Sequence, residues 1–304
     1  MAVALLEPKE YVRTIRPDDK SYSEAEAFDY TRWLATHHYE NFHVVTLLLP
    51  KELHQHFYNV YAFCRWADDL GDEIEDKQES LRLLAWWRNE LEAMYRGEVT
   101  HPVFVALRST VQEFEIPVEP FERLICAFEQ DQVVSRYQDF DQLFGYCTNS
   151  ANPVGHLVLY LCRYRDAERQ RLSDYTCTAL QLANFWQDIT VDLRKDRVYL
   201  PLQLIAAHGY TVEELFALKF NPRFEAVMSE AVNVAGNLFQ KGLPLIRTVN
   251  RRLALDLELF SRGGMKILDK IKSQGYNVLK ERPRITKAER VSLILRCLPR
   301  LLPF

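Results

Sequence analysis

Hydrophobic residues recur at helical spacing along almost the whole chain. Apolar positions return every three or four residues in long stretches, whereas the strict alternation typical of strands is scarce. The chain has only 10 glycines, and it contains no Asn-Gly or Asp-Gly pair to close a hairpin. This pattern predicts a single all-α domain over residues 1–304. The helices are expected at 23–38, 51–74, 78–96, 101–115, 118–137, 140–164, 172–194, 211–218, 222–248, 250–273 and 286–298.

Prolines divide this pattern. Pro50, Pro117, Pro201 and Pro222 fall where helices are expected to begin or end. Pro153 instead lies inside the helical stretch SANPVGHLVLYL. Because proline lacks the backbone N–H and clashes with the preceding turn, Pro153 is expected to kink this helix or divide it.

Composition excludes several classes of function. The formal net charge is −4, from 38 basic and 42 acidic residues, and no dense Lys/Arg stripe is present, so a nucleic-acid partner is not expected. No Gly-x-Gly-x-x-Gly or P-loop motif occurs, which argues against a Rossmann-type dinucleotide site. The six cysteines form no Cys-x-x-Cys pair and lie in apolar stretches, as buried thiols of a reducing compartment do.

The two ends of the chain bear on its location. The first residues lack the basic start and apolar core of a signal peptide, and no apolar stretch is long enough to span a bilayer. A cytoplasmic location is therefore expected. The last stretch, VSLILRCLPRLLPF, is apolar with two arginines. It fits either a helix packed on its own domain or a segment lying on a membrane surface.

Two acidic stripes stand out among the predicted helices. In the first, Asp68 and Asp72 continue a line of Phe57, Tyr61 and Cys64, so the aspartates are expected to face inward. The second stripe lies on one face of its helix, with Leu182, Phe185 and Ile189 on another; its members are Gln181, Asn184, Asp188 and Asp192.

Buried carboxylates need compensation, because an unpaired one costs several kcal/mol. Arginine or lysine could neutralise them, or divalent cations could bridge them with a phosphate as further ligand. An all-oxygen set of aspartate and asparagine suits Mg²⁺ and does not suit zinc. A third reading is a plain solvated acidic face. The Mg²⁺ reading assigns these ligands: Asp68, Asp72, Asn184, Asp188 and Asp192.

Together, D-D-x-x-D at 68–72 and Q-x-x-N-x-x-x-D-x-x-x-D at 181–192 resemble the squalene/phytoene synthase family. The resemblance covers roughly residues 25–290. Further matches are His38 with the Phe42 segment, Arg65, the Tyr146-Cys147 motif that runs to Gly155, the Arg197-x-Tyr199-x-Pro201 ending, and Arg282.

The resemblance implies an isoprenoid synthase helical bundle around a central active-site cavity. It implies that Mg²⁺ on the aspartates neutralises a diphosphate leaving group, and that Tyr146 assists proton removal. Substrate contacts are assigned to His38, Phe42, Arg65, Ser150, Asn152, Gln181, Arg197, Tyr199 and Arg282. Structural roles remain open for several of these residues: Arg65 could pair with Asp68 or Asp69, Arg197 could form a surface ion pair, and Tyr146 could belong to the core.

Departures from the family pattern indicate which of the family's reactions to expect. Gln187 stands where the family usually has arginine, and Gly264 stands where a tyrosine is common. The stretches HYENF, SANPVG and QLANFWQD are similar to the hydroxysqualene synthase subgroup, which is bacterial. That subgroup implies loss of diphosphate from presqualene diphosphate, rearrangement of the cation and capture by water, without NADPH. Ser150 and Asn152 are then expected to place the water.

The subgroup also implies partner enzymes that make presqualene diphosphate and later reduce hydroxysqualene, on a route to hopanoids. A substrate this apolar also makes peripheral membrane contact plausible. Two alternatives remain. One is a squalene synthase that condenses two farnesyl diphosphates with NADPH. The other is a non-catalytic relative that serves in assembly or lipid binding.

Overall fold

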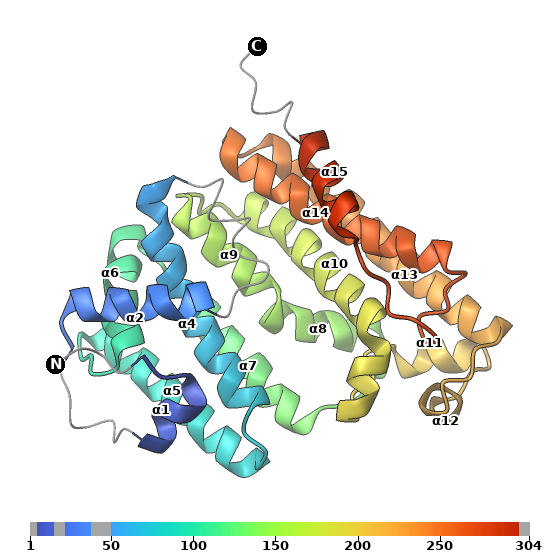
Figure 1. Ribbon diagram of the computed structural model, residues 1–304, viewed down its shortest axis with the longest axis horizontal. Coiled ribbons are helices and arrows are strands. Elements are labelled where there is room, and N and C mark those ends of the chain that lie inside the picture. Colours follow the sequence, from blue (N-terminus) through green and yellow to red (C-terminus); the bar gives the residue numbers. More distant parts are fainter. Residues whose placement is uncertain (1–4, 15–21, 38–49, 298–304) are drawn as a thin grey trace. The chain divides into compact units, whose positions relative to one another are not determined.

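The computed structural model describes residues 5–14, 22–37 and 50–297, and helices dominate this part of the chain (Figure 1). The described ranges hold no strand; their one β-type contact is an isolated bridge between Arg136 and Val198. The all-α prediction is therefore confirmed. His38 and Phe42, predicted to contact substrate, lie outside the described residues. No helix in the described ranges is both long and apolar enough to cross a membrane.

The chain divides into two compact units. Residues 1–133 and 156–165 form the first, and residues 134–155 and 166–304 form the second. Helix α9 (Asn152–Leu161) contributes residues to both. The prediction of one domain over 1–304 stays a prediction.

The first unit is built around α4 (Lys51–Asp72), which contacts most of the other helices in this unit. Its core is rich in aromatic rings, and the indoles of Trp66 and Trp87 stack with centroids 4.9 Å apart. The remaining helices of the unit are α1 (Pro8–Thr14), α2 (Glu24–His37), α5 (Lys77–Arg96), α6 (Pro102–Phe114) and α7 (Glu119–Val133).

His101 is enclosed by this aromatic core. Its ring centroid lies 4.4 Å from that of Trp66 and 5.1 Å from that of Trp87. Its Nδ1 accepts the backbone N–H of Val103 and so caps the start of α6. The neutral ring therefore carries its proton on Nε2, which is buried and has no hydrogen-bond partner among the described residues. Burial lowers the pKa of His101 to about 3.

The second unit is organised by α10 (Ala167–Asp192), against which α13 (Pro222–Gly242) and α14 (Arg251–Ser273) pack (Figure 1). Trp186 of α10 is fully buried and donates its indole N–H to the carbonyl of Ala231 at 3.0 Å. The other elements of this unit are α8 (Phe140–Ser150), η2 (Leu193–Lys195), α11 (Leu202–Ala207), α12 (Val212–Phe216), η3 (Leu243–Arg247) and α15 (Lys287–Cys297).

Local chemistry explains where the helix boundaries differ from the predictions. Pro153 does divide its helix, because α8 ends at Ser150 and α9 begins at Asn152. Helix α10 begins several residues earlier than predicted, because the Asp166 side chain caps it by accepting the Arg169 N–H. The predicted helix 222–248 ends at Gly242 and continues as the 3-10 turn η3, which contains Pro244. The short helices α1 and α11 were not predicted.

Gly264 of α14 lies where this helix packs tightly on its neighbours. A Cβ atom added there would lie 2.3 Å from Cζ of Phe239 and 2.9 Å from Cδ2 of Leu180. A tyrosine, which the family commonly has here, would therefore not fit. We expect Gly264→Ala to lower the free energy of unfolding by about 1–3 kcal/mol. Gly263→Ala is the matched control, because its Cβ would meet no atom within 4 Å. The control should raise stability by up to about 1 kcal/mol through helix propensity. Equal thermal unfolding of the two variants would contradict this packing.

Candidate functional site: acidic stripes and an aromatic wall

The first acidic stripe does not face the core of its unit. Asp72 is exposed and Asp68 is half-buried, so the predicted inward orientation is wrong. The core-facing side of α4 instead carries Phe63, Trp66 and Leu70. The stripe therefore presents its carboxylates on the open side of α4, where an ion or a phosphate can reach them.

The buried aspartate of this cluster is Asp69. Arg65 lies 2.6 Å from its carboxylate and 3.6 Å from that of Asp68. Burial raises the pKa of Asp69 to about 7, against the opposing effect of Arg65. Arg65 precedes Asp68 by three residues and Asp69 by four, so all three lie on one side of the helix, and Arg65 pairs with both aspartates.

The second stripe occupies the more open face of α10. Asn184 is exposed, while Gln181, Asp188 and Asp192 are half-buried, so these side chains also do not face the core. Leu182, Phe185 and Ile189 are buried, as predicted from their position on a different face of the helix from the stripe. The described structure places Arg282 on this stripe. Its Nε and Nη2 both donate to the Asp188 carboxylate, the latter at 3.1 Å.

A second contact holds the same segment on α10. The side-chain amide of Gln187 donates to the carbonyl of Pro283 at 2.6 Å. Gln187 is the residue that replaces the family's usual arginine. Its role in this structure is to fix residues 282–283 beside Asp188, and it adds no positive charge there. Arg282 is consequently the cation that the geometry assigns to Asp188.

Four aromatic residues form a cluster beside α10, here called the aromatic wall: Tyr137, Tyr146, Phe185 and Tyr199. The rings of Phe185 and Tyr199 are parallel within 6°, with centroids 3.7 Å apart. Tyr146 lies 6.2 Å from Phe185 and 6.1 Å from Tyr199, and Tyr137 stacks on Tyr199 at 5.8 Å. The structure thus brings together Tyr146 and Tyr199, two predicted site residues about fifty positions apart.

Tyr137 was not predicted as part of the site. Backbone pairing places it there, because Val198 N donates to Ser135 O and Leu202 N donates to Tyr137 O, each at 2.9 Å. These bonds join two short extended segments that are distant in sequence. In the sequence, the only sign of this role was an aromatic residue at the end of the helix predicted over 118–137.

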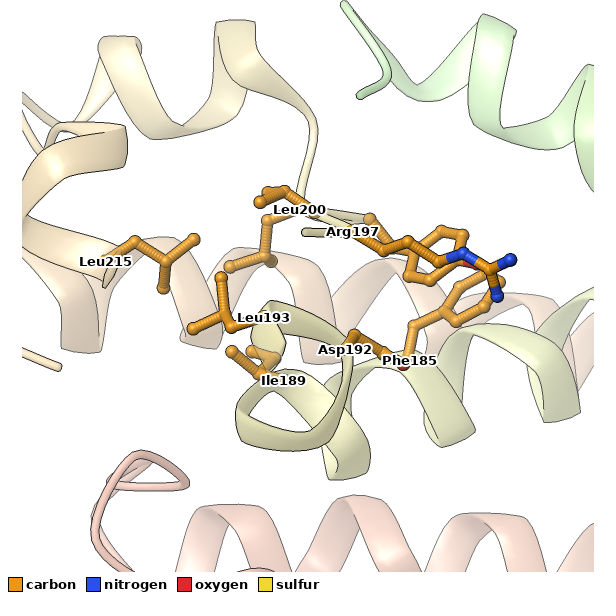
Figure 2. Close-up of a pocket in the computed structure, with 9 residues that line it drawn as sticks. Phe185, Ile189, Asp192, Leu193, Arg197, Leu200 and Leu215 are labelled. Atoms are coloured by element: carbon orange, nitrogen blue, oxygen red, sulfur yellow. The ribbon is translucent and has the colours of Figure 1, made fainter. Parts of the chain in front are cut away.

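A small pocket lies next to the aromatic wall. Figure 2 shows Phe185, Ile189 and Asp192 projecting from α10 toward Arg197 and Leu200. Its empty volume is about 210 Å³, part of it open to solvent. A pocket of this size is too small to enclose a long prenyl chain. Its charged lining side chains are Asp192 and Arg197, which carry opposite charges.

Ser150 and Asn152 lie at the junction of α8 and α9. Ser150 is one helical turn after Tyr146, and its Oγ is buried without a hydrogen-bond partner among the described residues. Asn152 is 6 % exposed, and its Oδ1 accepts the hydroxyl of Thr178 on α10 at 3.0 Å. The junction lies close to α10, because a Cβ atom on Gly155 would come within 2.3 Å of Ser173 Oγ. The site therefore offers a buried hydroxyl with unused hydrogen-bonding capacity.

The donor set fits Mg²⁺ better than a softer metal. Asn184, Asp188 and Asp192 present only oxygen ligands on one face of α10, and Asp68 and Asp72 do the same on α4. Within the described ranges, no three histidine, cysteine or acidic side chains gather into a metal site. Mg²⁺ commonly takes only one or two protein carboxylates and completes its shell with phosphate oxygens and water. A pair such as Asp188 and Asp192 suffices for that mode of binding.

Comparison with known proteins identifies the family. The squalene/phytoene synthase family model matches residues 35–289, which include every predicted site residue. A phytoene synthase from Thermus thermophilus is 32 % identical over 261 residues, covering 84 % of this chain and 87 % of that protein. The chloroplastic phytoene synthase of an Oncidium hybrid cultivar is 28 % identical over 278 residues, covering 88 % and 67 %.

Solved structures agree with this result. The crystal structure of squalene synthase HpnC from Alicyclobacillus acidocaldarius matches with a TM-score of 0.81 and 42 % identity, covering 84 % of this chain and 96 % of that one. A dehydrosqualene synthase solved with a ligand shares the fold at a TM-score of 0.82 and 22 % identity, covering 91 % and 97 %. The chain belongs to the squalene/phytoene synthase family.

Proposed function

We propose that this protein converts presqualene diphosphate to hydroxysqualene in an Mg²⁺-dependent reaction. Members of the family process isoprenoids and act on prenyl diphosphates. The observation that carries the proposal is the 42 % identity with squalene synthase HpnC over 84 % of the chain, against 32 % with the Thermus phytoene synthase. This likeness favours a C30 product. The HYENF, SANPVG and QLANFWQD stretches favour the alcohol as product.

The acidic stripes are proposed to bind the metal. Asp188 and Asp192, with the amide oxygen of Asn184, supply hard oxygen ligands from α10, and Asp68 and Asp72 supply them from α4. Bound Mg²⁺ would act as a Lewis acid that neutralises the departing diphosphate. Arg282 presents a planar guanidinium at the same stripe, and this group can bind phosphate oxygens in a bidentate manner. Arg282 is therefore proposed to move from the carboxylate of Asp188 to the diphosphate.

The aromatic wall is proposed to shield the carbocation. Phe185 and Tyr199 present stacked rings, whose π faces attract positive charge at close range. Both side chains are buried and stacked on each other, so they can exclude stray water while the skeleton rearranges. The Tyr146 hydroxyl, in the same cluster, is the proposed group for proton removal.

Ser150 is proposed to hold the water that captures the cation. Its buried Oγ can accept one hydrogen bond from water and donate another. When water adds to the cation, a C–O bond forms and one proton leaves. The result is an alcohol, without any reductant. The neighbouring Asn152 is held in place by Thr178 and keeps this corner polar.

Removing the Ser150 hydroxyl should change the product. We expect Ser150→Ala to lower the share of hydroxysqualene among the products about fivefold, the equivalent of one hydrogen bond of about 1 kcal/mol. Thr148→Val on the same helix is the matched control, because its hydroxyl already bonds the carbonyl of Phe144. Product ratios are measured by gas chromatography–mass spectrometry. A ratio unchanged by Ser150→Ala would remove Ser150 from the water site.

The proposal is tested by incubating the purified protein with presqualene diphosphate, farnesyl diphosphate or geranylgeranyl diphosphate. Each substrate is assayed with and without NADPH, and with Mg²⁺ or EDTA. Hydroxysqualene formed from presqualene diphosphate, dependent on Mg²⁺ and independent of NADPH, would support it. Phytoene from geranylgeranyl diphosphate would instead match the phytoene synthase relatives. No product from any substrate would indicate a non-catalytic relative.

A second candidate is a squalene synthase that condenses two farnesyl diphosphates and reduces the intermediate with NADPH. The name of the 42 % identical structure, squalene synthase HpnC, favours it. Squalene formed from farnesyl diphosphate only when NADPH is present would establish this reaction in place of the first.

A further inference from the structure

Helix α15 exposes a continuous apolar stripe. Val291, Ile294 and Leu295 are 55 %, 43 % and 58 % exposed, and their i, i+3, i+4 spacing puts them on one face. Single exposed apolar side chains are ordinary on protein surfaces, but a contiguous set on one helical face marks an interaction site. This stripe is the feature that needs an explanation.

The orientation of α15 is fixed by its other face. Helix α15 packs on α14 (Figure 1), and Cys297 is buried. Glu289, two turns earlier on the same face, accepts Lys270 Nζ at 2.8 Å and lies 3.4 Å from Lys266 Nζ. The helix is therefore held by ion pairs, by the half-buried Leu293 and by the buried thiol, while Val291, Ile294 and Leu295 point away from α14. More of its large apolar side chains are thus exposed than packed, contrary to the usual amphipathic pattern of a surface helix.

The charges around the stripe indicate what kind of partner binds it. Lys287, Arg290 and Arg296 are exposed beside the apolar side chains. Glu289, the carboxylate of this helix, is already paired with the two lysines of α14. A helix with an apolar face and unneutralised basic flanks has the chemistry that binds an anionic lipid surface.

A second group of exposed apolar side chains in the same unit has neighbouring cations that are already paired with a carboxylate. Phe216, Leu218 and Phe220 are also exposed, near the end of α12. The nearby cations Lys219 and Arg223 both pair with Glu214, at 2.9 and 2.7 Å. The two groups are thus similar in hydrophobicity, but among the described residues only the group on α15 has neighbouring cations without an ion pair.

We propose that α15 docks on an anionic bilayer. Val291, Ile294 and Leu295 enter the boundary between head groups and acyl chains, and Lys287, Arg290 and Arg296 bind lipid phosphates. This membrane contact does not depend on which reaction the protein catalyses, so it can be tested separately from the proposed function.

Vesicle sedimentation with the full-length protein tests the proposal. Wild type should bind vesicles containing 30 % phosphatidylglycerol at least tenfold more tightly than pure phosphatidylcholine, and added salt should weaken this binding. Val291→Glu/Leu295→Glu and, separately, Lys287→Gln/Arg290→Gln/Arg296→Gln should each weaken it at least tenfold. Leu218→Glu is the matched control and should bind like wild type. Thermal unfolding of every variant checks that the fold is retained.

Three results would overturn the proposal. The first is a wild-type protein that fails to bind anionic vesicles. The second is binding by both α15 variants at wild-type strength, which would place any lipid contact elsewhere in the chain. The third is a dimer in solution that Val291→Glu/Leu295→Glu dissociates, because a second copy would then be the occupant of the stripe.

Discussion

Asp188→Asn is expected to reduce turnover of presqualene diphosphate about 10³-fold, because a neutral amide binds Mg²⁺ more weakly than a carboxylate does, and the bound Mg²⁺ offsets the charge of the leaving group. Stability should change little. The pair of Asp188 with Arg282 is partly exposed, and exposed ion pairs contribute about 0–1 kcal/mol. Turnover at saturating Mg²⁺, the Mg²⁺ concentration for half-maximal rate, and thermal unfolding are measured together.

Asp196→Asn provides the matched control. Asp196 also pairs with an arginine, Arg136, at 2.5 Å, but it lies outside the stripe. Its backbone is in the left-handed region, with φ of 55°, which asparagine tolerates well. This variant should keep near wild-type turnover. Wild-type activity in Asp188→Asn, or equal losses in both variants, would contradict metal binding by the α10 stripe.

Much of the fold followed from the sequence because helical periodicity is local. The long helices α4, α5, α10 and α14 were all expected, and Pro153 divided its helix as its chemistry requires. The direction in which the acidic stripes face was mispredicted. On α4 the line of Phe57, Tyr61 and Cys64 was taken as the core line. The true core line runs through Phe63, Trp66 and Leu70, and at 3.6 residues per turn it lies on nearly the opposite side of the helix from Tyr61 and Cys64.

The contacts that shape the candidate site depend on residues far apart in the chain. Arg282 reaches Asp188 across 94 positions, and no spacing rule in the sequence gives that pairing. Tyr137 joins the aromatic wall only because its segment pairs with residues 198–202. Arg65 differs, since its pairs lie three and four residues away on one helix and could be anticipated. The roles of all these residues in the reaction stay proposals.

Asp256→Asn is expected to stabilise the protein increasingly as pH rises. Asp256 is 3 % exposed, and neither carboxylate oxygen has a hydrogen-bond partner in the described part of the chain. Burial raises the pKa of Asp256 to about 8, so the folded state keeps the proton that the unfolded state loses near pH 4. Stability contributed by the protonated acid is therefore complete below pH 4, and about 1.4 kcal/mol is lost per pH unit up to pH 8.

The variant should escape this loss, because the amide does not ionise while it fills the same space. The difference in unfolding free energy between Asp256→Asn and wild type should grow by about 2 kcal/mol between pH 6.5 and 8. His101 has a lowered pKa, so its contribution to stability falls as pH falls below 6.5, opposite in direction to that of Asp256. This contribution is the same in both proteins and cancels in the difference. Asp269→Asn, exposed on the same helix, should show no such growth. A difference that stays constant from pH 5 to 8 would mean that Asp256 is ionised and compensated in the folded protein.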